Sequence, residues 1–150
     1  MITNEKIITI NRPVEEVFAY VGDLQNGPKW QKALVEAWRL NGGPLGIGSK
    51  FSSIRKFMGR KMSSVIQFTA FELNKKIVFK SISGSSPFEQ TFLFEPMAGG
   101  TRLTTRLALQ TSGLMGLAQP MIASGLKREV DENFGILKEL LETRILPVSS

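Results

Sequence analysis

The C-terminal stretch 114–143 constrains the fold more than any other part of the chain. Its apolar residues recur at steps of three and four, the spacing that places side chains on one stripe of an α-helix. They are Leu114, Leu117, Ala118, Met121, Ile122, Leu126, Val130, Phe134, Leu137 and Leu141. At about 1.5 Å per residue such a helix could reach roughly 45 Å, so it must lie across a broad partner. Because several β-like runs precede it, we expect that partner to be a curved sheet.

The two halves of this stretch differ in composition. The first half is weakly polar and contains Pro120, which lacks an N–H and predicts either a kink or the true start of the helix. The second half is rich in charge, and a spacing of four predicts three ion pairs along it. These are Lys127–Asp131, Arg128–Glu132 and Lys138–Glu142. We interpret the stretch as a surface helix whose first half either packs on the sheet or lines a cavity.

Seven runs before this helix have the alternation or β-branched content of strands. They are 2–10, 33–40, 51–58, 61–71, 77–83, 88–95 and 101–110. After the first run, Pro13 and two glutamates predict a short helix ending near Gly22, and 23–30 predicts a turn or a second short helix. Turns at 41–44, 59–60, 74–76, 84–87 and 96–100 make most connections short, which favours antiparallel pairing. The sequence therefore predicts a single α+β domain.

Composition excludes several kinds of chemistry. The 150 residues include no histidine and no cysteine, so Ser–His–Asp and Cys–His mechanisms and thiolate metal sites are excluded. A metal site built from carboxylates alone is not expected, and we expect no cofactor. Any catalysis would have to use Asp, Glu, Lys, Tyr, or the positioning and desolvation of a substrate.

The formal net charge of +6 is spread along the chain. The densest basic patch is Lys50, Arg55, Lys56, Arg60 and Lys61. It holds a single aromatic, Phe57, so we interpret it as a solvated hairpin and expect no nucleic-acid partner. No apolar run approaches the ~20 residues that span a bilayer, and the N-terminus lacks a signal-peptide pattern. We therefore expect a cytoplasmic protein without a transmembrane segment.

Several short motifs, taken in order, resemble those of a known superfamily. They are Arg12-Pro13, 14–20 (VEEVFAY), Asp23-Leu24, 28–30 (PKW), 46–48 (GIG), 71–76 (FELNKK), 99–103 (GGTRL) and 137–142 (LKELLE). The chain resembles the START-like (SRPBCC) superfamily, and more closely its polyketide cyclase/dehydrase branch. The resemblance implies the helix-grip fold: a seven-stranded antiparallel curved sheet wrapped around a long C-terminal helix, with two short helices after the first strand. We expect this domain to cover 1–146, followed by a tail at 147–150.

The same resemblance implies a cavity between sheet and helix that takes hydrophobic molecules. From strand alternation and helix spacing we select candidate ligand-binding residues. They are Trp30 at the rim, Phe68, Phe79, Gln90, Phe92 and Leu103 from the sheet, and Met121, Ile122 and Leu126 from the helix. The alternative is that they simply fill a core. Ten phenylalanines and six methionines suit the wall of a large apolar site.

Three functions stay open at this point. The first is binding of a lipid- or polyketide-like hydrophobic small molecule. The second is a cyclase or dehydratase that positions its substrate and uses carboxylate acid/base chemistry, with Glu36 and either Arg39 or Arg55 as the best candidate pair. We expect Arg55 to point to solvent, although an inward Arg55 could pair with a ligand carboxylate. The third is a module that docks a protein or membrane through the apolar first half of the helix. A homodimer also stays open.

Overall fold

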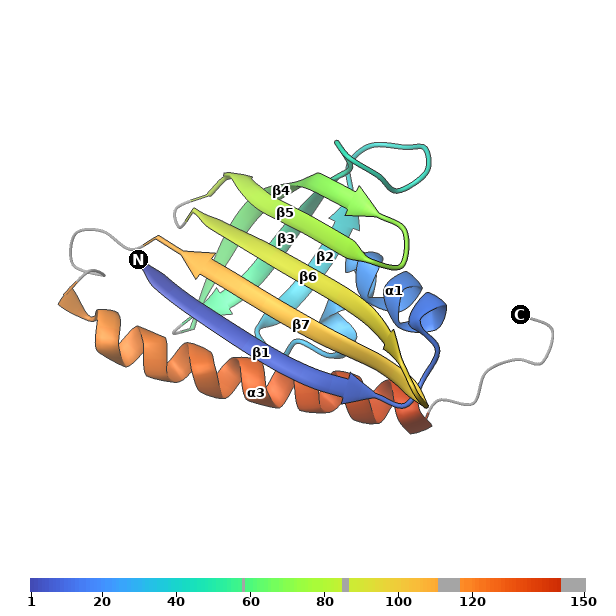
Figure 1. The fold of residues 1–150 in the computed structure, drawn as a ribbon. Coiled ribbons are helices and arrows are strands. Elements are labelled where there is room, and N and C mark those ends of the chain that lie inside the picture. Colours follow the sequence, from blue (N-terminus) through green and yellow to red (C-terminus); the bar gives the residue numbers. More distant parts are fainter. Residues whose placement is uncertain (58, 85–86, 111–116, 144–150) are drawn as a thin grey trace.

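The computed structural model describes residues 1–57, 59–84, 87–110 and 117–143 (Figure 1). The elements, in chain order, are β1 (Ile2–Ile10), α1 (Val14–Gly22), the 3-10 helix η1 (Leu24–Lys29), β2 (Leu34–Arg39), β3 (Lys50–Phe57), β4 (Arg60–Glu72), β5 (Lys76–Ser83), β6 (Phe88–Met97), β7 (Gly100–Leu109) and α3 (Gln119–Thr143). The predicted tail 147–150 and the start of the predicted helix at 114–116 lie outside the described residues.

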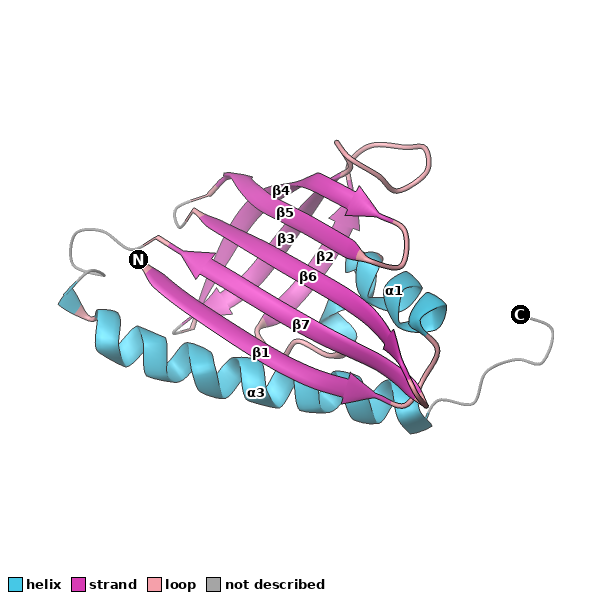
Figure 2. Ribbon diagram, in the orientation of Figure 1, coloured by secondary structure: helices cyan, strands magenta, loops and turns pink. Residues whose placement is uncertain are grey.

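The seven strands form one antiparallel sheet in the order β1-β7-β6-β5-β4-β3-β2. The sheet curls, so that β1 and β2 are its two edges, and α3 runs along β1 in the same direction (Figures 1 and 2). The two short helices, α1 and η1, follow β1 as expected. The predicted helix-grip fold is confirmed.

Apolar and polar residues alternate with a period of two along these strands. Each strand therefore turns one face toward the interior and the other toward solvent. In β6, Phe92 and Phe94 are buried while Glu89 and Glu95 are exposed. Cross-strand partners share a face, so Leu103 of β7, opposite Phe94, is fully buried as well. The apolar faces of successive strands therefore form one continuous concave wall.

The hairpin between β6 and β7 is tighter than the sequence predicts. Instead of a turn over 96–100, β6 continues to Met97, which pairs with Gly100. Pro96 fits within the strand because the pairing of β6 with β5 has already ended at Leu93, so its missing N–H costs no bond to β5 there. Gly100 is required at its position because a Cβ there would lie 2.2 Å from the carbonyl oxygen of Ile10.

Pro120 lies at the start of α3, which was one of the two alternatives predicted for this proline, the other being a kink. It is the second residue of a 25-residue helix, a position where its missing N–H has no helical partner to lose. The predicted stripe is continuous only in the second half, where Val130, Phe134, Leu137 and Leu141 are buried. Met121 is 78% exposed because it lies about 100° around the helix from Ile122, which is half-buried on the side of the stripe.

Two of the three ion pairs predicted along the helix are wrong. Lys138–Glu142 forms, at 2.8 Å, but Asp131 instead pairs with Lys6 at 3.1 Å and Glu132 with Lys32 at 3.2 Å. Lys6 lies on the edge strand β1, and Lys32 lies two residues before the other edge strand, β2. The acidic residues of α3 therefore join the helix to both edges of the sheet.

No helix within the described part of the chain is long and apolar enough to cross a membrane.

Candidate functional site

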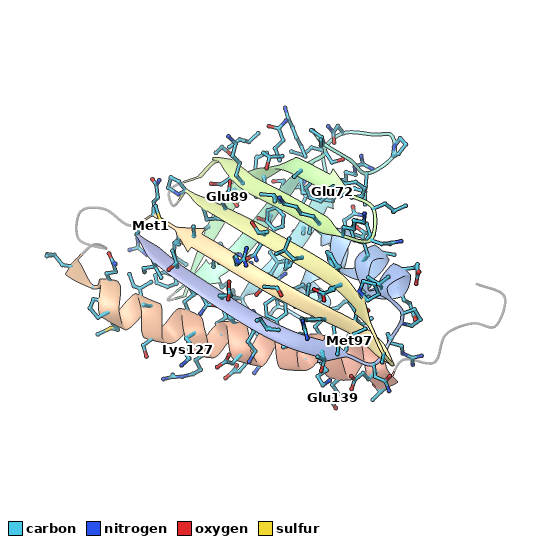
Figure 3. All side chains as sticks on the ribbon, in the orientation of Figure 1. Met1, Glu72, Glu89, Met97, Lys127 and Glu139 are labelled. Carbon is cyan, nitrogen blue, oxygen red and sulfur yellow. The ribbon has the colours of Figure 1, made fainter. Side chains whose placement is uncertain are left out.

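The interior between sheet and α3 has two halves. The closed half lies beside α1, at the end of the sheet that carries Glu72 and Met97, and the open half lies toward the end that carries Met1 and Glu89 (Figure 3). Both are bounded by the concave face of the same sheet. Their side chains differ in burial and in polarity, and this contrast identifies the candidate site.

The closed half is a packed apolar core. It is formed by side chains that are each at most 9% exposed, from α1, η1 and its flank, the sheet and α3. They are Val17, Phe18, Val21, Leu24, Trp30, Phe94, Leu103, Val130, Phe134, Leu137 and Leu141. Ring centroids lie 5.0 Å apart between Phe18 and Phe94 and 5.1 Å apart between Trp30 and Phe134. These are the separations of tightly packed aromatic pairs, so the protein's own side chains fill this half.

A row of four phenylalanines crosses the sheet at the border of the two halves. Phe51, Phe68, Phe79 and Phe92 come from four neighbouring strands, β3 to β6, and all are buried. Successive ring centroids lie 5.5, 6.0 and 6.0 Å apart. Phe134 of α3 continues the row, 6.4 Å from Phe92. This row marks the border between the buried side chains and the half-buried ones beyond them.

The open half has inward-facing side chains that are mostly half-buried, although Ile2, opposite Leu109, is buried. From the sheet the half-buried ones are Ser53, Arg55, Met62, Ser64, Ser81, Phe88, Gln90, Leu107 and Leu109, and from α3 they are Ile122, Leu126 and Glu129. The inward direction of the sheet residues follows from their register, since they alternate with outward residues in step with buried Phe51 and Leu103. Two of the serines bond each other, with 3.1 Å between the Oγ atoms of Ser53 and Ser64. Apolar and hydroxyl groups are thus mixed along one wall.

Arg55 reaches across the open half to α3. Its Nη2 donates to Gln31 Oε1 at 2.6 Å, and its Nη1 approaches Glu129 Oε1 at 3.4 Å. The prediction that Arg55 points to solvent is therefore wrong. The reason is that its two partners, 24 and 74 residues away, come from different elements that the fold brings over β3. Gln31 and Glu129 are the residues that sequence reasoning missed.

The environment of Arg55 is enclosed by protein but accessible to water. Burial lowers the pKa of its guanidinium, and the charge of Glu129 acts in the opposite direction. Nevertheless 41% of the Arg55 side-chain surface is accessible, as is 35% of that of Glu129. Arg55 therefore keeps N–H donors within reach of water while its guanidinium is held between β3 and α3.

The nine residues predicted to contact a ligand fall into three environments. Five are brought together in the closed half or in the phenylalanine row, and these are Trp30, Phe68, Phe79, Phe92 and Leu103. Gln90, Ile122 and Leu126 lie in the open half. Met121 lies outside both, exposed on α3. The role of these residues as ligand contacts stays a prediction.

Gln90 is satisfied by the backbone rather than by a neighbouring side chain. Its Nε2 donates to the carbonyl oxygens of Thr91 at 3.2 Å and Arg106 at 3.1 Å. The donors of this amide are therefore used within the sheet. The side-chain oxygen is the group that a ligand or water could bond.

Glu36 and Arg39 do not form an interior pair. Glu36 is exposed on β2, and the guanidinium of Arg39 donates to the carbonyl oxygen of Gly43 at 2.6 Å and to Ser49 Oγ at 3.3 Å. Arg39 thus holds the connection between β2 and β3. Among the residues considered for proton transfer, only Arg55 lies in the interior, and its carboxylate partner is Glu129.

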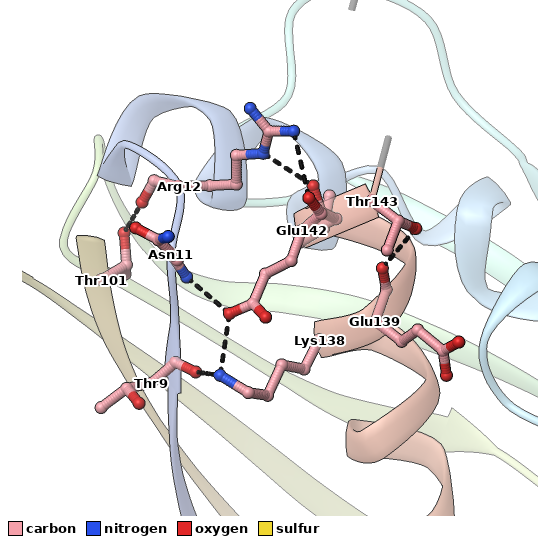
Figure 4. Close-up of polar contacts among 9 residues, drawn as sticks. Thr9, Asn11, Arg12, Thr101, Lys138, Glu139, Glu142 and Thr143 are labelled. Atoms are coloured by element: carbon pink, nitrogen blue, oxygen red, sulfur yellow. Dashed lines mark hydrogen bonds and ion pairs between the residues drawn. The ribbon is translucent and has the colours of Figure 1, made fainter. Parts of the chain in front are cut away.

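A second polar cluster joins the C-terminal end of α3 to the end of β1 (Figure 4). We call it the C-terminal latch, and it consists of Glu142, Lys138, Arg12 and the backbone groups that they bond. Glu142 accepts from the backbone N–H of Asn11 and from Lys138, both at 2.8 Å, and Lys138 also donates to the carbonyl oxygen of Thr9. Arg12 Nε donates to the carbonyl oxygen of Leu141 at 2.7 Å. The bond from Lys138, followed by that from Asn11, lowers the pKa of Glu142. The latch secures the closed half.

The sheet order, the two short helices and the helix held across the concave face define a helix-grip domain. The family model described as polyketide cyclase/dehydrase and lipid transport matches residues 1–142. The chain belongs to this family. Comparison with curated protein sequences gives no match.

Three solved structures illustrate the likeness of the fold. The Zhui aromatase/cyclase from a Streptomyces species superposes with a TM-score of 0.77 and 10% identity, over 99% of this chain and 98% of that one. A START superfamily protein from Mycobacterium smegmatis gives a TM-score of 0.75 and 17% identity, over 93% and 97% of the two chains. A protein from Thermus thermophilus gives a TM-score of 0.77 and 19% identity, over 93% and 95%.

Proposed function

We propose that this protein binds a hydrophobic small molecule, lipid- or polyketide-like, in the open half of its interior. Membership of a family described by polyketide cyclisation, dehydration and lipid transport supports a ligand-binding or cyclase role. The bound molecule would lie between the half-buried wall of the sheet and the residues of α3 that precede Val130. Its apolar body would cover Phe88, Leu107 and Leu126.

The observation that carries this proposal is inward-facing apolar surface that the protein covers only in part. Phe88 and Leu126 pack against the edge of the core, yet both stay half-buried. Folding normally covers such side chains, since each Å² of apolar surface removed from water contributes about 25 cal/mol. A ligand that covers this surface would gain the same term, which is the main driving force for binding in apolar sites.

Polar groups in the same space would fix the ligand's orientation. Ser53 and Ser64 lie on the wall near Arg55, and each hydroxyl retains capacity to accept or donate beyond their mutual bond. Arg55 has five N–H groups, of which the bonds to Gln31 and Glu129 use two. We therefore expect a ligand with one polar end, directed to this group, and an apolar remainder.

The test is ligand retention and rebinding by the purified full chain. Native mass spectrometry should show a retained adduct, and the delipidated protein should bind a fluorescent hydrophobic probe. Gln90→Trp should fill the open half and weaken probe binding by about tenfold or more. Glu89→Trp is the matched control, since Glu89 is the adjacent, exposed residue on the outer face of β6. Absence of both adduct and probe binding, or equal binding by the two variants, would contradict the proposal.

A second candidate function, cyclisation or dehydration of a polyketide-like substrate, is favoured by the interior carboxylate. Glu129 faces the open half beside a guanidinium, and with no histidine in the chain it is the acid/base group best placed there. The two functions predict different results for Glu129→Gln. An enzyme would lose turnover of a linear poly-β-carbonyl thioester while still retaining probe binding, whereas a binding protein would show no turnover in either form.

A further inference from the structure

One end of the sheet, the hairpin end, brings together segments that are distant in the sequence. Because the strands are antiparallel, β3 and β7 finish there and β1 and β4 begin there. The start of α3 lies at the same end (Figure 1). Gln119 at that start donates to the carbonyl oxygen of Met1 at 3.1 Å. The hairpin end is also the end toward which the open half of the interior lies.

Exposed apolar side chains project from the hairpin end. Leu117 is 83% exposed, Met121 is 78% exposed, and Phe57 at the end of β3 is 43% exposed. The first two belong to the segment that sequence analysis singled out for its apolar character. Large apolar side chains so fully in water carry a cost that a partner surface would relieve.

Five exposed cations accompany these side chains. They are Lys56, Arg60, Lys61, Lys127 and Arg128. Among the described residues none of the five forms an ion pair, whereas Lys6, Lys32 and Arg55 do. Arg128 lies seven residues after Met121 on α3, hence on the same side of the helix. Two acidic residues lie near these cations: Glu89 faces outward at the start of β6, and Glu129 pairs with Arg55.

The opposite end of the sheet provides the contrast. It also has exposed apolar residues, including Ile47 and Leu73. These share their end with exposed charges of both signs, because Lys75 and Arg102 are exposed there together with four carboxylates. The carboxylates are Glu15, Glu72, Glu95 and Glu139. The exposed charge of this end is therefore mixed, whereas that of the hairpin end is mainly positive.

We propose that the hairpin end docks on the surface of an anionic lipid bilayer. Leu117, Met121 and Phe57 would enter the boundary between headgroups and acyl chains, and the five cations would face anionic headgroups. Both contributions are those that hold peripheral proteins on membranes, with about fivefold in partitioning for each cation near the surface. A nucleic acid would use the cations but gain little from Leu117 and Met121, because aliphatic side chains do not stack on bases. The docking does not depend on whether the interior holds a ligand.

Vesicle co-sedimentation of the full chain tests this inference. We expect binding to phosphatidylglycerol/phosphatidylcholine vesicles, weak binding to pure phosphatidylcholine, and release as salt rises. Arg60→Gln combined with Lys61→Gln should reduce partitioning by roughly tenfold or more. Leu117→Glu combined with Met121→Glu should reduce it by at least about as much. Leu73→Glu is the matched control, since Leu73 is 71% exposed at the opposite end, and it should change binding little.

Three results would overturn the inference. The first is equal binding to both vesicle types, and the second is an equal loss of binding in the Leu73→Glu variant. The third is salt-sensitive binding to duplex DNA, without binding to vesicles, that the Leu117→Glu and Met121→Glu substitutions leave unchanged. Circular dichroism of each variant separates loss of docking from loss of fold. Probe binding in solution should be retained by the hairpin-end variants, so failure of docking and failure of ligand binding are distinguishable.

Discussion

The closed and open halves of the interior are built by the same strands and the same helix, yet their side chains differ in kind. The closed half contains aromatic and aliphatic groups at most 9% exposed. The open half combines serines, Gln90 and the Arg55–Glu129 pair with half-buried Met62, Phe88 and Leu107. A sheet curled around a helix thus needs only part of its concave face for stability. The remainder is free to carry groups that would be costly in a packed core.

Helix α3 shows the same division within a single element. Its second half contributes four buried apolar side chains, from Val130 to Leu141, and ends in the C-terminal latch. Its first half carries Ile122 and Leu126, which are half-buried, and Met121, which is exposed. Since a fully buried Leu or Phe contributes about 1.5–3 kcal/mol, the second half anchors the helix. The first half can then serve a ligand or a surface without loss of the fold.

The largest expected effect comes from truncating equivalent leucines in the two halves. Leu137→Ala should lower the free energy of unfolding by about 2–5 kcal/mol, because Leu137 is 0% exposed and its removal leaves a cavity. Leu126→Ala should cost about 1 kcal/mol or less, since this side chain is already half in water. Urea unfolding of both variants checks the difference. Equal losses would mean that the open half is packed after all.

A smaller effect is expected at the polar anchor of the open half. Glu129→Ala should cost about 1 kcal/mol, because it leaves the enclosed guanidinium of Arg55 without its carboxylate, although water still reaches both groups. Arg55→Met should be nearly neutral for stability, because it removes the charge and keeps the volume. A double-mutant cycle by urea unfolding measures their coupling. A loss of several kcal/mol in Arg55→Met would show that the pair serves the core rather than a ligand.

The strands and the long helix could be predicted because each has one apolar face. In β6 the sequence alternates Phe88, Gln90, Phe92 and Phe94 with polar residues, and this period alone places the strand and its inward face. The sequence predicts the bounds of the hairpin after β6 less accurately. Pro96 predicts a turn in isolation, but whether a proline fits a strand depends on where the neighbouring strand ends, which is a property of the assembled sheet.

The candidate site was predictable only in its apolar part. In β3 both faces carry polar residues, so the alternation of Phe51, Ser53 and Arg55 does not by itself place the arginine inside. Its partners Gln31 and Glu129 come from segments that meet only in the folded chain. One signal was present: Glu129 lies three residues after Leu126, on the side of the helix that faces the sheet.

The smallest expected effect concerns the C-terminal latch, which tests whether the closed half is secured independently of the open half. The folded state lowers the pKa of Glu142, chiefly through the bond from Lys138, so the latch stabilises the fold while Glu142 is ionised. Its contribution is present above the pKa of a glutamate in the unfolded chain, about 4.3, and is lost as pH falls through the lower folded-state pKa. Glu142→Gln should therefore cost about 0.5 kcal/mol at pH 7, because the pair with Lys138 lies at the surface, and this difference from the natural chain should shrink as pH falls below about 4.

Glu139→Gln is the matched control for the latch. Its side chain is exposed one turn earlier on α3, and the bond that Thr143 makes to residue 139 uses the backbone carbonyl oxygen, which the substitution leaves intact. Urea unfolding at pH 7, 4 and 3 should show a pH-dependent difference for Glu142→Gln and almost none for Glu139→Gln. Probe binding should be unchanged in both, because the latch lies beside the closed half. A Glu142→Gln effect that is constant with pH, or that weakens probe binding as well, would contradict the separation of the two halves.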